Sequence, residues 1–313
     1  MVKVLLTSTS FQDTPGAHQR LLYSQGFDIT TMRGPLAVAD LLPVIDGFDA
    51  VLCGDDSYTE QVLTKGRHGR LRYLGKYGVG LDRIDLAAAK RLGITVTNVP
   101  GVNQRAVAEH VFGLLLCFQR NIHTENKLVH EGHWTRYTGH EIQGKRIGVC
   151  GLGAVGREVA GMASLLGLSV AVCDPTLHDD PLPADVPWTT LPDIDALLSW
   201  SDFVSLHVPH TPDTHEIIRQ DSLDRIRGKG LVLINTARGK LVNNADVLAA
   251  LDDGTLQGYL ADVVDEEPIT PGHPFLGHAR ILLTPHIGSR TFESVERQGL
   301  ATVRNLLDFL GLN

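Results

Sequence analysis

The stretch KRIGVCGLGAVGREVAGMASLLGLSVAVCD, residues 145–174, contains one complete strand–helix–strand pattern. It begins with an apolar run at 147–150 and continues with Gly151, Gly153 and Gly156 in the spacing GxGxxG. The first glycine permits a tight turn, the second lets the backbone approach a pyrophosphate, and the third lets the helix pack closely on the strand. Unpaired N–H groups at the helix N-terminus attract phosphate charge. We therefore predict a dinucleotide-binding βαβ unit.

The second apolar run of this unit, residues 168–173, ends at Asp174. A carboxylate here can accept hydrogen bonds from both hydroxyls of an adenosine ribose, but it repels the 2′-phosphate of NADP. The residues that follow, PTLHDD, supply no Arg or Lys to compensate that charge. We therefore expect NAD as the cofactor. The alternative role for Asp174 is a helix N-cap or a solvated turn acid.

The composition excludes several classes of function. The chain has 313 residues, 43% hydrophobic and 20% charged, which is enough for two globular domains. A net charge of -8 without any Lys/Arg cluster argues against nucleic-acid binding. No apolar run is long enough to span a membrane, and the apolar part of the N-terminus is too short for a signal peptide.

Cysteine and histidine patterns give no sign of disulfides or of a metal. The cysteines lie in apolar segments without CxxC spacing, at Cys53, Cys117, Cys150 and Cys173. This is typical of buried reduced thiols and favours a cytoplasmic location. Three histidines occur in HVPHTPDTH, residues 207–215, but prolines interrupt the segment and no carboxylate or thiolate cluster accompanies them. We expect no bound metal.

Apolar runs and helical patterns alternate along the chain in two parts. In the first part, strands are expected at residues 2–6, 50–53, 72–74 and 94–97. They predict a small α/β domain with a parallel sheet. In the second part, strands are expected at residues 147–150, 169–173, 203–207, 231–235, 258–263 and 281–283. Their regular recurrence predicts a doubly wound dinucleotide-binding sheet.

Two long helical patterns lie outside this alternation. Residues 103–122 are apolar over most of the helix surface, so we expect this helix at a domain junction or a subunit interface, and we predict a homodimer built partly on it. The amphipathic pattern at 292–310 remains once the second sheet is complete, and we expect it to return to the N-terminal domain. The larger domain, 99–287, is then inserted in a smaller one made of 1–98 and 288–313.

Three further motifs follow in the second part: NTARGK at 235–240, ADVVDEEP at 261–268 and TPHIGS at 284–289. They resemble the catalytic-arginine, aspartate-to-glutamate and catalytic-histidine motifs of the D-isomer-specific 2-hydroxyacid dehydrogenase family. Upstream, KYGVGLDRIDL at 76–86 resembles the family's substrate-carboxylate loop, and TNVPGVNQRAVAEH at 97–110 resembles the start of its inter-domain helix. The resemblance implies an α/β fold of two Rossmann-like domains, with a doubly wound parallel NAD-binding sheet inserted into a smaller flavodoxin-like substrate domain.

Hydride transfer between nicotinamide and a 2-hydroxy acid needs one group that takes the hydroxyl proton and one that holds the carboxylate. His286 follows a strand, at the edge where ligands bind in open α/β sheets, and imidazole serves as acid or base near neutral pH. Arg238 follows another strand and offers a planar fork that matches a carboxylate. A carboxylate on the other ring nitrogen would fix the tautomer of the histidine. The resemblance assigns this role to Glu267, and Glu266 is the competing candidate.

The resemblance also implies the remaining cofactor contacts. They are the backbone N–H groups of Ala154 and Val155 at the pyrophosphate, His207 and Pro209 beside the adenosine, and Thr236, Ala237, Arg238, Asp262, His286 and Gly288 around the nicotinamide. Asp262 is expected to hydrogen-bond the carboxamide, the alternative being a turn acid at the end of a strand.

The substrate is expected to be a small anionic molecule. In the loop of Lys76, Tyr77, Gly78, Val79 and Gly80, the glycines leave backbone N–H groups available for a carboxylate, and the lysine adds charge. A plain tight turn is the alternative for this loop.

Within the family, the chain resembles phosphoglycerate dehydrogenases in its GVG loop and in GHWTRY, where Arg136 lies near their phosphate-binding arginine. Asp55 and Asp56, however, stand where those enzymes have an arginine, and they would repel a phosphate. The candidates are therefore a D-2-hydroxy acid or 2-oxo acid, including 3-phosphoglycerate and a phosphonate analogue. Glu267 argues against formate dehydrogenases, which pair their histidine with glutamine. An NAD(H)-sensing binding protein of the corepressor type is the alternative to an enzyme.

Overall fold

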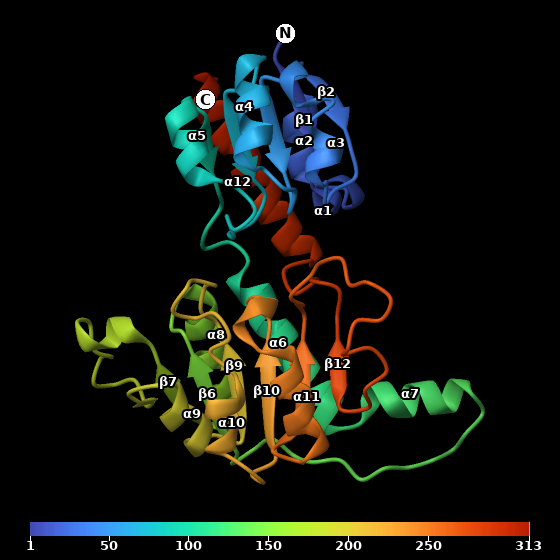
Figure 1. The fold of residues 1–313 in the computed structure, drawn as a ribbon, viewed down its shortest axis with the longest axis vertical. Coiled ribbons are helices and arrows are strands. Elements are labelled where there is room, and N and C mark those ends of the chain that lie inside the picture. The colour runs from blue at the N-terminus through green and yellow to red at the C-terminus, as the bar shows by residue number, and fades with distance from the viewer. Residues whose placement is uncertain (313) are drawn as a thin grey trace. The chain divides into compact units, whose positions relative to one another are not determined.

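The computed structural model describes residues 1–312, which form two compact α/β units (Figure 1). The first unit is Met1–Asn103 together with the C-terminal segment from Arg290, and the second is Gln104–Ser289. The boundaries thus lie at 103/104 and 289/290, compared with the predicted 98/99 and 287/288. Each unit is built on one parallel sheet, so the predicted fold class is confirmed.

The first unit has a five-stranded parallel sheet in the order β2-β1-β3-β4-β5. Its strands are β1 (Lys3–Leu6), β2 (Asp28–Thr31), β3 (Ala50–Cys53), β4 (Tyr73–Lys76) and β5 (Thr95–Thr97). This is the flavodoxin-like order, in which ligands bind beyond the carboxyl ends of the strands. The sequence did not predict β2, because this edge strand is largely exposed and its residues, DITT, contain no apolar run.

Six helices cover the sheet of the first unit. They are α1 (Thr9–Asp13), α2 (Ala17–Tyr23), α3 (Val38–Leu41), α4 (Glu60–His68), α5 (Leu86–Leu92) and α12 (Phe292–Leu310), joined by the 3-10 helix η1 (Ile45–Gly47). The C-terminal helix α12 packs on α2, β3 and β4. Its Val295, Val303 and Leu306 are buried with Val4 and Leu6 of β1. This helix therefore completes the core of the N-terminal unit.

The second unit has a seven-stranded parallel sheet in the order β12-β11-β10-β9-β6-β7-β8. Its strands are β6 (Arg146–Cys150), β7 (Ser169–Cys173), β8 (Thr189–Thr190), β9 (Phe203–Leu206), β10 (Leu231–Asn235), β11 (Leu256–Ala261) and β12 (Ile281–Leu283). The chain order reverses at β6, as in doubly wound dinucleotide-binding sheets. The sequence did not predict β8. The predicted end of β11, at residue 263, was wrong: the strand ends at Ala261, where its pairing with β12 ends.

Helices cover both faces of this sheet (Figure 1). They are α6 (Gln104–Gln119), α7 (Ile122–His130), α8 (Ala154–Leu165), α9 (Ile194–Trp200), α10 (Gln220–Asp224) and α11 (Asn244–Asp252), with the 3-10 helices η2 (Pro175–His178) and η3 (Gly239–Leu241). One core cluster joins α6 and α8 to the sheet through Val111 and Val159. The other joins α9 and α11 to it through Leu197 and Val247.

The helix predicted at 103–122 is shorter and more enclosed than expected. It ends at Gln119, and Asn121, with a φ of 53°, separates it from α7. Val111 and Leu115 of α6 are fully buried within the second unit, where the helix packs on α8. Most of the apolar surface of this helix is thus used inside the chain itself.

Three further features concern the part of the chain that the structure describes. No helix there combines the length and the apolar character needed to cross a membrane. No three His, Cys, Asp or Glu side chains gather around a point where they could hold a metal ion. All four cysteines are unbridged thiols.

Candidate functional site

The predicted cofactor and catalytic residues of the second unit lie in loops beyond the carboxyl ends of its strands. Across the sheet, these loops carry His286 after β12, Asp262 after β11, Arg238 after β10, His207 after β9, Gly151 after β6 and Asp174 after β7. Because parallel strands all end at the same edge, the loops lie together there (Figure 1). The sheet thereby brings together residues that are far apart in the sequence.

The glycine-rich loop has the geometry of a phosphate cradle. Gly151 has a φ of +92°, and a Cβ there would lie 2.7 Å from the carbonyl group of His207. A Cβ on Gly156 would collide with the carbonyl oxygen of Gly151, so only glycine lets α8 lie this close to β6. A Cβ on Gly153 would meet nothing within 4 Å. The loop is therefore closed on its protein side and open in front of the helix.

The polar groups at this opening fit a dinucleotide. Among residues 1–312, no acceptor is found for the backbone N–H groups of Gly153, Ala154 and Val155. Such groups at a helix N-terminus are the usual ligands of a diphosphate. Thr236, directly after β10, has a buried hydroxyl that finds no partner among the described residues. An open space beside unpaired donors is what NAD requires.

Asp174, at the end of β7, is anchored by the glycine-rich loop and by its own loop. Its Oδ2 accepts a hydrogen bond from the backbone N–H of Leu152 at 2.6 Å, and Oδ1 accepts two from Thr176 at 2.9 and 2.7 Å. Partial burial raises the pKa of Asp174, but these hydrogen bonds outweigh it and hold the pKa below its ordinary value. The N-cap role considered from the sequence is thus real. With these hydrogen bonds formed, Oδ2 can still accept another one from a ribose hydroxyl.

The loop after β9 presents an uncharged surface. Burial lowers the pKa of His207 to about 3, and its Nε2 lies 2.8 Å from the hydroxyl of Ser205. The backbone N–H of His207 donates to Cys150 at 2.7 Å, which joins this loop to β6. Pro209 follows, and its carbonyl accepts a hydrogen bond from Thr214. A neutral, rigid wall of this kind suits an adenosine.

Asn235 organises the turn that carries Arg238. Its Nδ2 donates to the carbonyl of Arg238 at 2.8 Å and to the hydroxyl of Tyr259 at 3.2 Å, and its Oδ1 accepts from the N–H of Ala237 at 3.1 Å. A Cβ on Gly239 would collide with the backbone of the loop after β11, so glycine allows the two loops to touch. No role for Asn235 was predicted from the sequence. Its place at the start of a turn was the available signal.

Glu267 is the carboxylate that reaches His286. Its Oε2 lies 2.7 Å from Nδ1 of the histidine, and its Oε1 accepts from the N–H of Val264 at 3.2 Å. Glu266, the competing candidate, is exposed. A carboxylate on Nδ1 fixes the tautomer and assigns proton exchange to Nε2.

Asp262 holds the loop on which His286 lies. Only 2% exposed, it accepts at Oδ1 from the Thr284 hydroxyl (2.6 Å) and the Ile287 N–H (2.9 Å), and at Oδ2 from the Gly288 N–H (2.7 Å). Its backbone carbonyl accepts from the N–H of His286 at 2.8 Å. Asp262 is therefore a strand-end anchor, as the alternative interpretation held. Its contact with a carboxamide stays a prediction.

In the first unit, the loop Lys76–Gly80 lies beyond the carboxyl end of β4. Gly78 has a φ of +115°. Within the described residues, no acceptor is found for the N–H groups of Gly78, Val79 and Gly80. Successive unpaired N–H groups in such a turn form a concave anion site. The side chain of Tyr77 is instead buried edge-on against Phe11, so only its backbone belongs to the loop surface.

The charge of Lys76 is compensated by a neighbour. Its Nζ, on a side chain only 6% exposed, donates to Asp55 at 2.6 Å and to the carbonyl of Gly54 at 2.7 Å, while Asp55 is 59% exposed. Asp56 points into the unit and accepts from the N–H of Leu36 at 2.8 Å. Burial raises the pKa of Asp56. The expectation that both acids face an anionic substrate is therefore wrong for Asp56.

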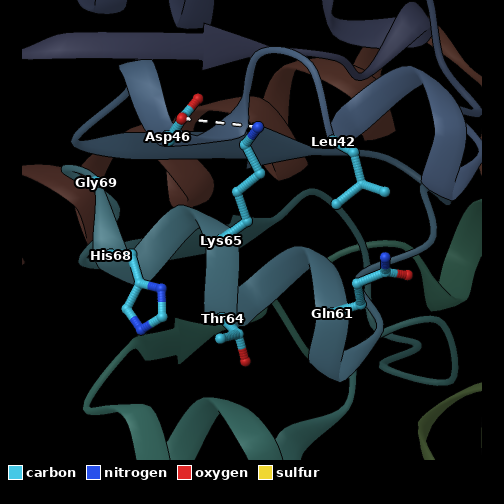
Figure 2. A pocket seen from close by; sticks show the side chains of 7 residues that line it. All are labelled: Leu42, Asp46, Gln61, Thr64, Lys65, His68 and Gly69. Carbon is cyan, nitrogen blue, oxygen red and sulfur yellow. Dashed lines mark ion pairs between the residues drawn. The ribbon is translucent and has the colours of Figure 1, made fainter.

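A surface hollow of about 500 Å³ lies elsewhere in the first unit (Figure 2). It is lined by Leu42, Asp46, Gln61, Thr64, Lys65, His68 and Gly69. Lys65 and Asp46 form an ion pair of 3.8 Å at its border. Asp46 precedes β3 and Gly69 precedes β4, so the hollow is at the amino ends of the strands. Within the first unit it is thus separate from the Lys76–Gly80 loop, which lies beyond the carboxyl end of β4.

Comparison with known proteins gives a consistent result. The family model described as D-isomer specific 2-hydroxyacid dehydrogenase, NAD binding domain, matches residues 112–288. A glyoxylate reductase of Thermofilum pendens is 35% identical over 283 residues, 88% of this chain and 82% of that protein. A hydroxypyruvate reductase of Thermotoga maritima is 32% identical over 301 residues, 95% of each chain.

The solved structures give the same picture. The crystal structure of the TT0316 protein from Thermus thermophilus superimposes with a TM-score of 0.87 at 33% identity, covering 99% of this chain and 97% of that one. Some matched relatives are longer. The chain spans 49% and 53% of the D-3-phosphoglycerate dehydrogenases of Synechocystis and Archaeoglobus fulgidus.

Proposed function

The chain belongs to the D-isomer-specific 2-hydroxyacid dehydrogenase family, and on that basis we propose that it reduces a small, unphosphorylated 2-oxo acid. It is an NAD-dependent oxidoreductase that interconverts 2-hydroxy and 2-oxo acids. Glyoxylate and hydroxypyruvate are the substrates that we favour.

The chemistry requires a proton donor and a carboxylate clamp. NADH, when bound, supplies the hydride. In the proposed reduction, Nε2 of His286 gives a proton to the substrate's carbonyl oxygen, and it takes that proton back in oxidation. Glu267 holds the ring through Nδ1 and stabilises the imidazolium. The guanidinium of Arg238 binds the substrate carboxylate and polarises the carbonyl. We propose that the N–H groups of the Lys76–Gly80 loop, in the first unit, bind an anionic group of the substrate.

The observation that carries the substrate proposal is the pair of Asp55 and Lys76. The lysine is buried and already bound at 2.6 Å, so the group exposed beside the anion-binding loop is the carboxylate of Asp55. The pair leaves the charge of Lys76 compensated, and the exposed carboxylate oxygens of Asp55 only accept hydrogen bonds, so the acceptor oxygens of a phosphate dianion are disfavoured there. A hydroxyl, as in hydroxypyruvate, could instead donate a hydrogen bond to it. Relatives named glyoxylate reductase and hydroxypyruvate reductase support this choice.

NADH absorbance tests the proposal when glyoxylate, hydroxypyruvate, phosphohydroxypyruvate and phosphonates are screened side by side. We expect kcat/KM for an unphosphorylated 2-oxo acid to exceed that for phosphohydroxypyruvate by about tenfold or more, the effect of about 1.4 kcal/mol of repulsion. As a control, His286→Ala should lower turnover by about two to four orders of magnitude while NADH still binds.

Two results of this screen would contradict the proposal. A preference for the phosphorylated acid would show that Asp55 does not face the substrate. Binding of NADH without turnover of any acid would favour the NAD(H)-sensing binding protein instead.

We also infer a homodimer, formed through α7 and the segment that follows it, residues 131–141. α7 buries none of its residues. Both carry exposed apolar side chains: Ile122 and Val129 in α7, and Trp134 and Tyr137 in the segment. In Figure 1, α7 extends away from the sheet of its own unit. A second copy is the occupant that we propose, because a two-fold axis covers the same patch on both chains.

The cytoplasm is the location that we propose. Cys150 and Cys173 are register partners on β6 and β7 and are not bridged. Neighbouring thiols persist in a compartment that keeps them reduced. Cell fractionation followed by an activity assay tests this.

A further inference from the structure

His110, in α6, contacts the loop that carries His286. Its Nε2 lies 2.9 Å from the hydroxyl of Thr284 and 3.3 Å from Oδ1 of Asp262. We propose that His110 is a positioning residue, which holds His286 in the geometry needed for proton transfer by donating a hydrogen bond to Thr284. This inference rests on the proposed role of His286.

The direction of the hydrogen bonds follows from their chemistry. The Thr284 hydroxyl lies 2.6 Å from Oδ1 of Asp262, and an ionised carboxylate can only accept. Burial raises the pKa of Asp262, but hydrogen bonds from His110, Thr284 and the Ile287 N–H outweigh it and hold the carboxyl ionised. The single hydroxyl hydrogen of Thr284 is thus used on Asp262. Toward His110, Thr284 can only accept, so Nε2 of His110 carries a hydrogen and donates it.

This series of hydrogen bonds ends at the backbone around His286. Asp262 accepts from the N–H groups of Ile287 and Gly288 through its carboxylate, and from that of His286 through its carbonyl. His286 has a φ of 53°, in the left-handed region that a non-glycine residue keeps only when its surroundings hold it. The hydrogen bonds of Asp262 provide this hold.

His110 is a rigid starting point for the network. Its side chain is only 19% exposed, and its neighbours Ala108 and Val111 on α6 are fully buried in the core. Gly288 lets the loop come close: a Cβ there would lie 2.9 Å from Oδ2 of Asp262 and 3.5 Å from the ring of His110. Loss of the His110 donor leaves Thr284 and Asp262 without their link to α6. The loop can then relax, and a small displacement of a catalytic group costs much of the rate.

His110→Ala and His110→Gln test the proposal, since a glutamine amide can replace the Nε2 donor. We expect His110→Ala to lower kcat by about tenfold to a hundredfold, with the Kd of NADH and the melting temperature near wild type. His110→Gln should recover most of the loss. The matched control is His278→Ala, which removes another His–Asp contact, to Asp252 at 3.4 Å, just before β12. Its kcat should stay at the wild-type value.

A second pair of variants keeps the test decisive if His110→Ala does not fold. Thr284→Ser retains the hydroxyl between His110 and Asp262 and should stay active. Thr284→Val lacks this hydroxyl and should lose as much kcat as His110→Ala. Wild-type kcat in His110→Ala, or no recovery in His110→Gln, would overturn the proposal.

A double variant separates this inference from the proposed function. In a His286→Ala background, His110→Ala should have no further effect on kcat, because it acts through the ring that is missing. A full His110 effect in that background would refute the positioning role alone. Normal turnover of the single variant His286→Ala would instead refute the proposed function.

Discussion

The carboxylate of Glu267 contacts the imidazole ring of His286, with 2.7 Å between Oε2 and Nδ1. An amide there no longer favours the imidazolium. In Glu267→Gln, the histidine is therefore deprotonated at lower pH, and we expect the acidic limb of kcat/KM for 2-hydroxy acid oxidation to move to lower pH. The matched control is Glu266→Gln, which changes the exposed neighbour and should leave the profile in place. A shift in the control variant alone would reassign the orienting carboxylate to Glu266.

Asp174 is the residue expected to select the cofactor. A charge-assisted hydrogen bond is worth about 1.5–3 kcal/mol, and repulsion of the 2′-phosphate adds to this difference, so NAD should be preferred over NADP by about a hundredfold or more. Because Asp174 also binds the N–H of Leu152, Asp174→Ala should weaken both cofactors, and the ratio of their Kd values is the informative quantity. The ratio of the Kd for NADP to the Kd for NAD should decrease. Since the pKa of Asp174 lies below its ordinary value, the wild-type preference should be constant between about pH 6 and 9.

Another N-cap aspartate provides the control for this measurement. Asp193 caps α9 by accepting from the N–H of Ala196 at 2.8 Å. Asp193→Ala removes a cap of the same kind and should leave the NAD/NADP ratio unchanged. Equal use of NAD and NADP by the wild-type enzyme would mean that Asp174 does not contact the ribose.

At the scale of elements, the sequence predicted those that carry their own local signals. Helix α12 has the predicted bounds, 292–310, because Thr291 caps its N-terminus and Gly311 ends it in the left-handed conformation. Strands β2 and β8 were missed, because they lie away from the core and are largely exposed. An apolar run is then not required, and without one the pattern of a strand is lost. The end of α6 was misplaced for a similar reason, since Asn121 gives only a weak stop signal.

Two glycines in α8 test how closely this helix lies on the glycine loop. A Cβ on Gly156 would collide with Gly151, whereas a Cβ on Gly161 would meet nothing within 4 Å. Gly161→Ala should raise the free energy of unfolding by about 0.5–1 kcal/mol, the gain in helix propensity. Gly156→Ala should lower it by about 1–3 kcal/mol and weaken NADH binding, because the loop must move. Urea unfolding and NADH titration measure both. Equal tolerance of the two variants would contradict the close contact.

At the scale of the whole molecule, the sequence predicted which side chains follow strands but not which of them touch. Arg238, Glu267 and His286 could be selected as candidates because each lies in a motif beyond a strand end. His110 and Thr284 are far apart in the sequence, and only the fold brings them within 2.9 Å. Asp55 and Asp56 were both predicted to repel a phosphate, because the sequence does not show which way each side chain points. They lie in an irregular loop where one faces solvent and the other is buried, which no local pattern distinguishes.

The homodimer depends on residues that the fold of a single chain does not use. Trp134 and Tyr137 are 80% and 56% exposed, and aromatic side chains of this kind dominate the energy of interfaces. Light scattering should therefore report twice the 34.0 kDa of one chain for the wild type and a single chain for Trp134→Ser/Tyr137→Ser, with unchanged circular dichroism. Phe292→Ser is the control, because Phe292 is 75% exposed but lies outside this segment, so the variant should stay dimeric. A wild-type protein that scatters as one chain at micromolar concentration would contradict the homodimer. Dissociation by Phe292→Ser as well would move the interface away from residues 131–141.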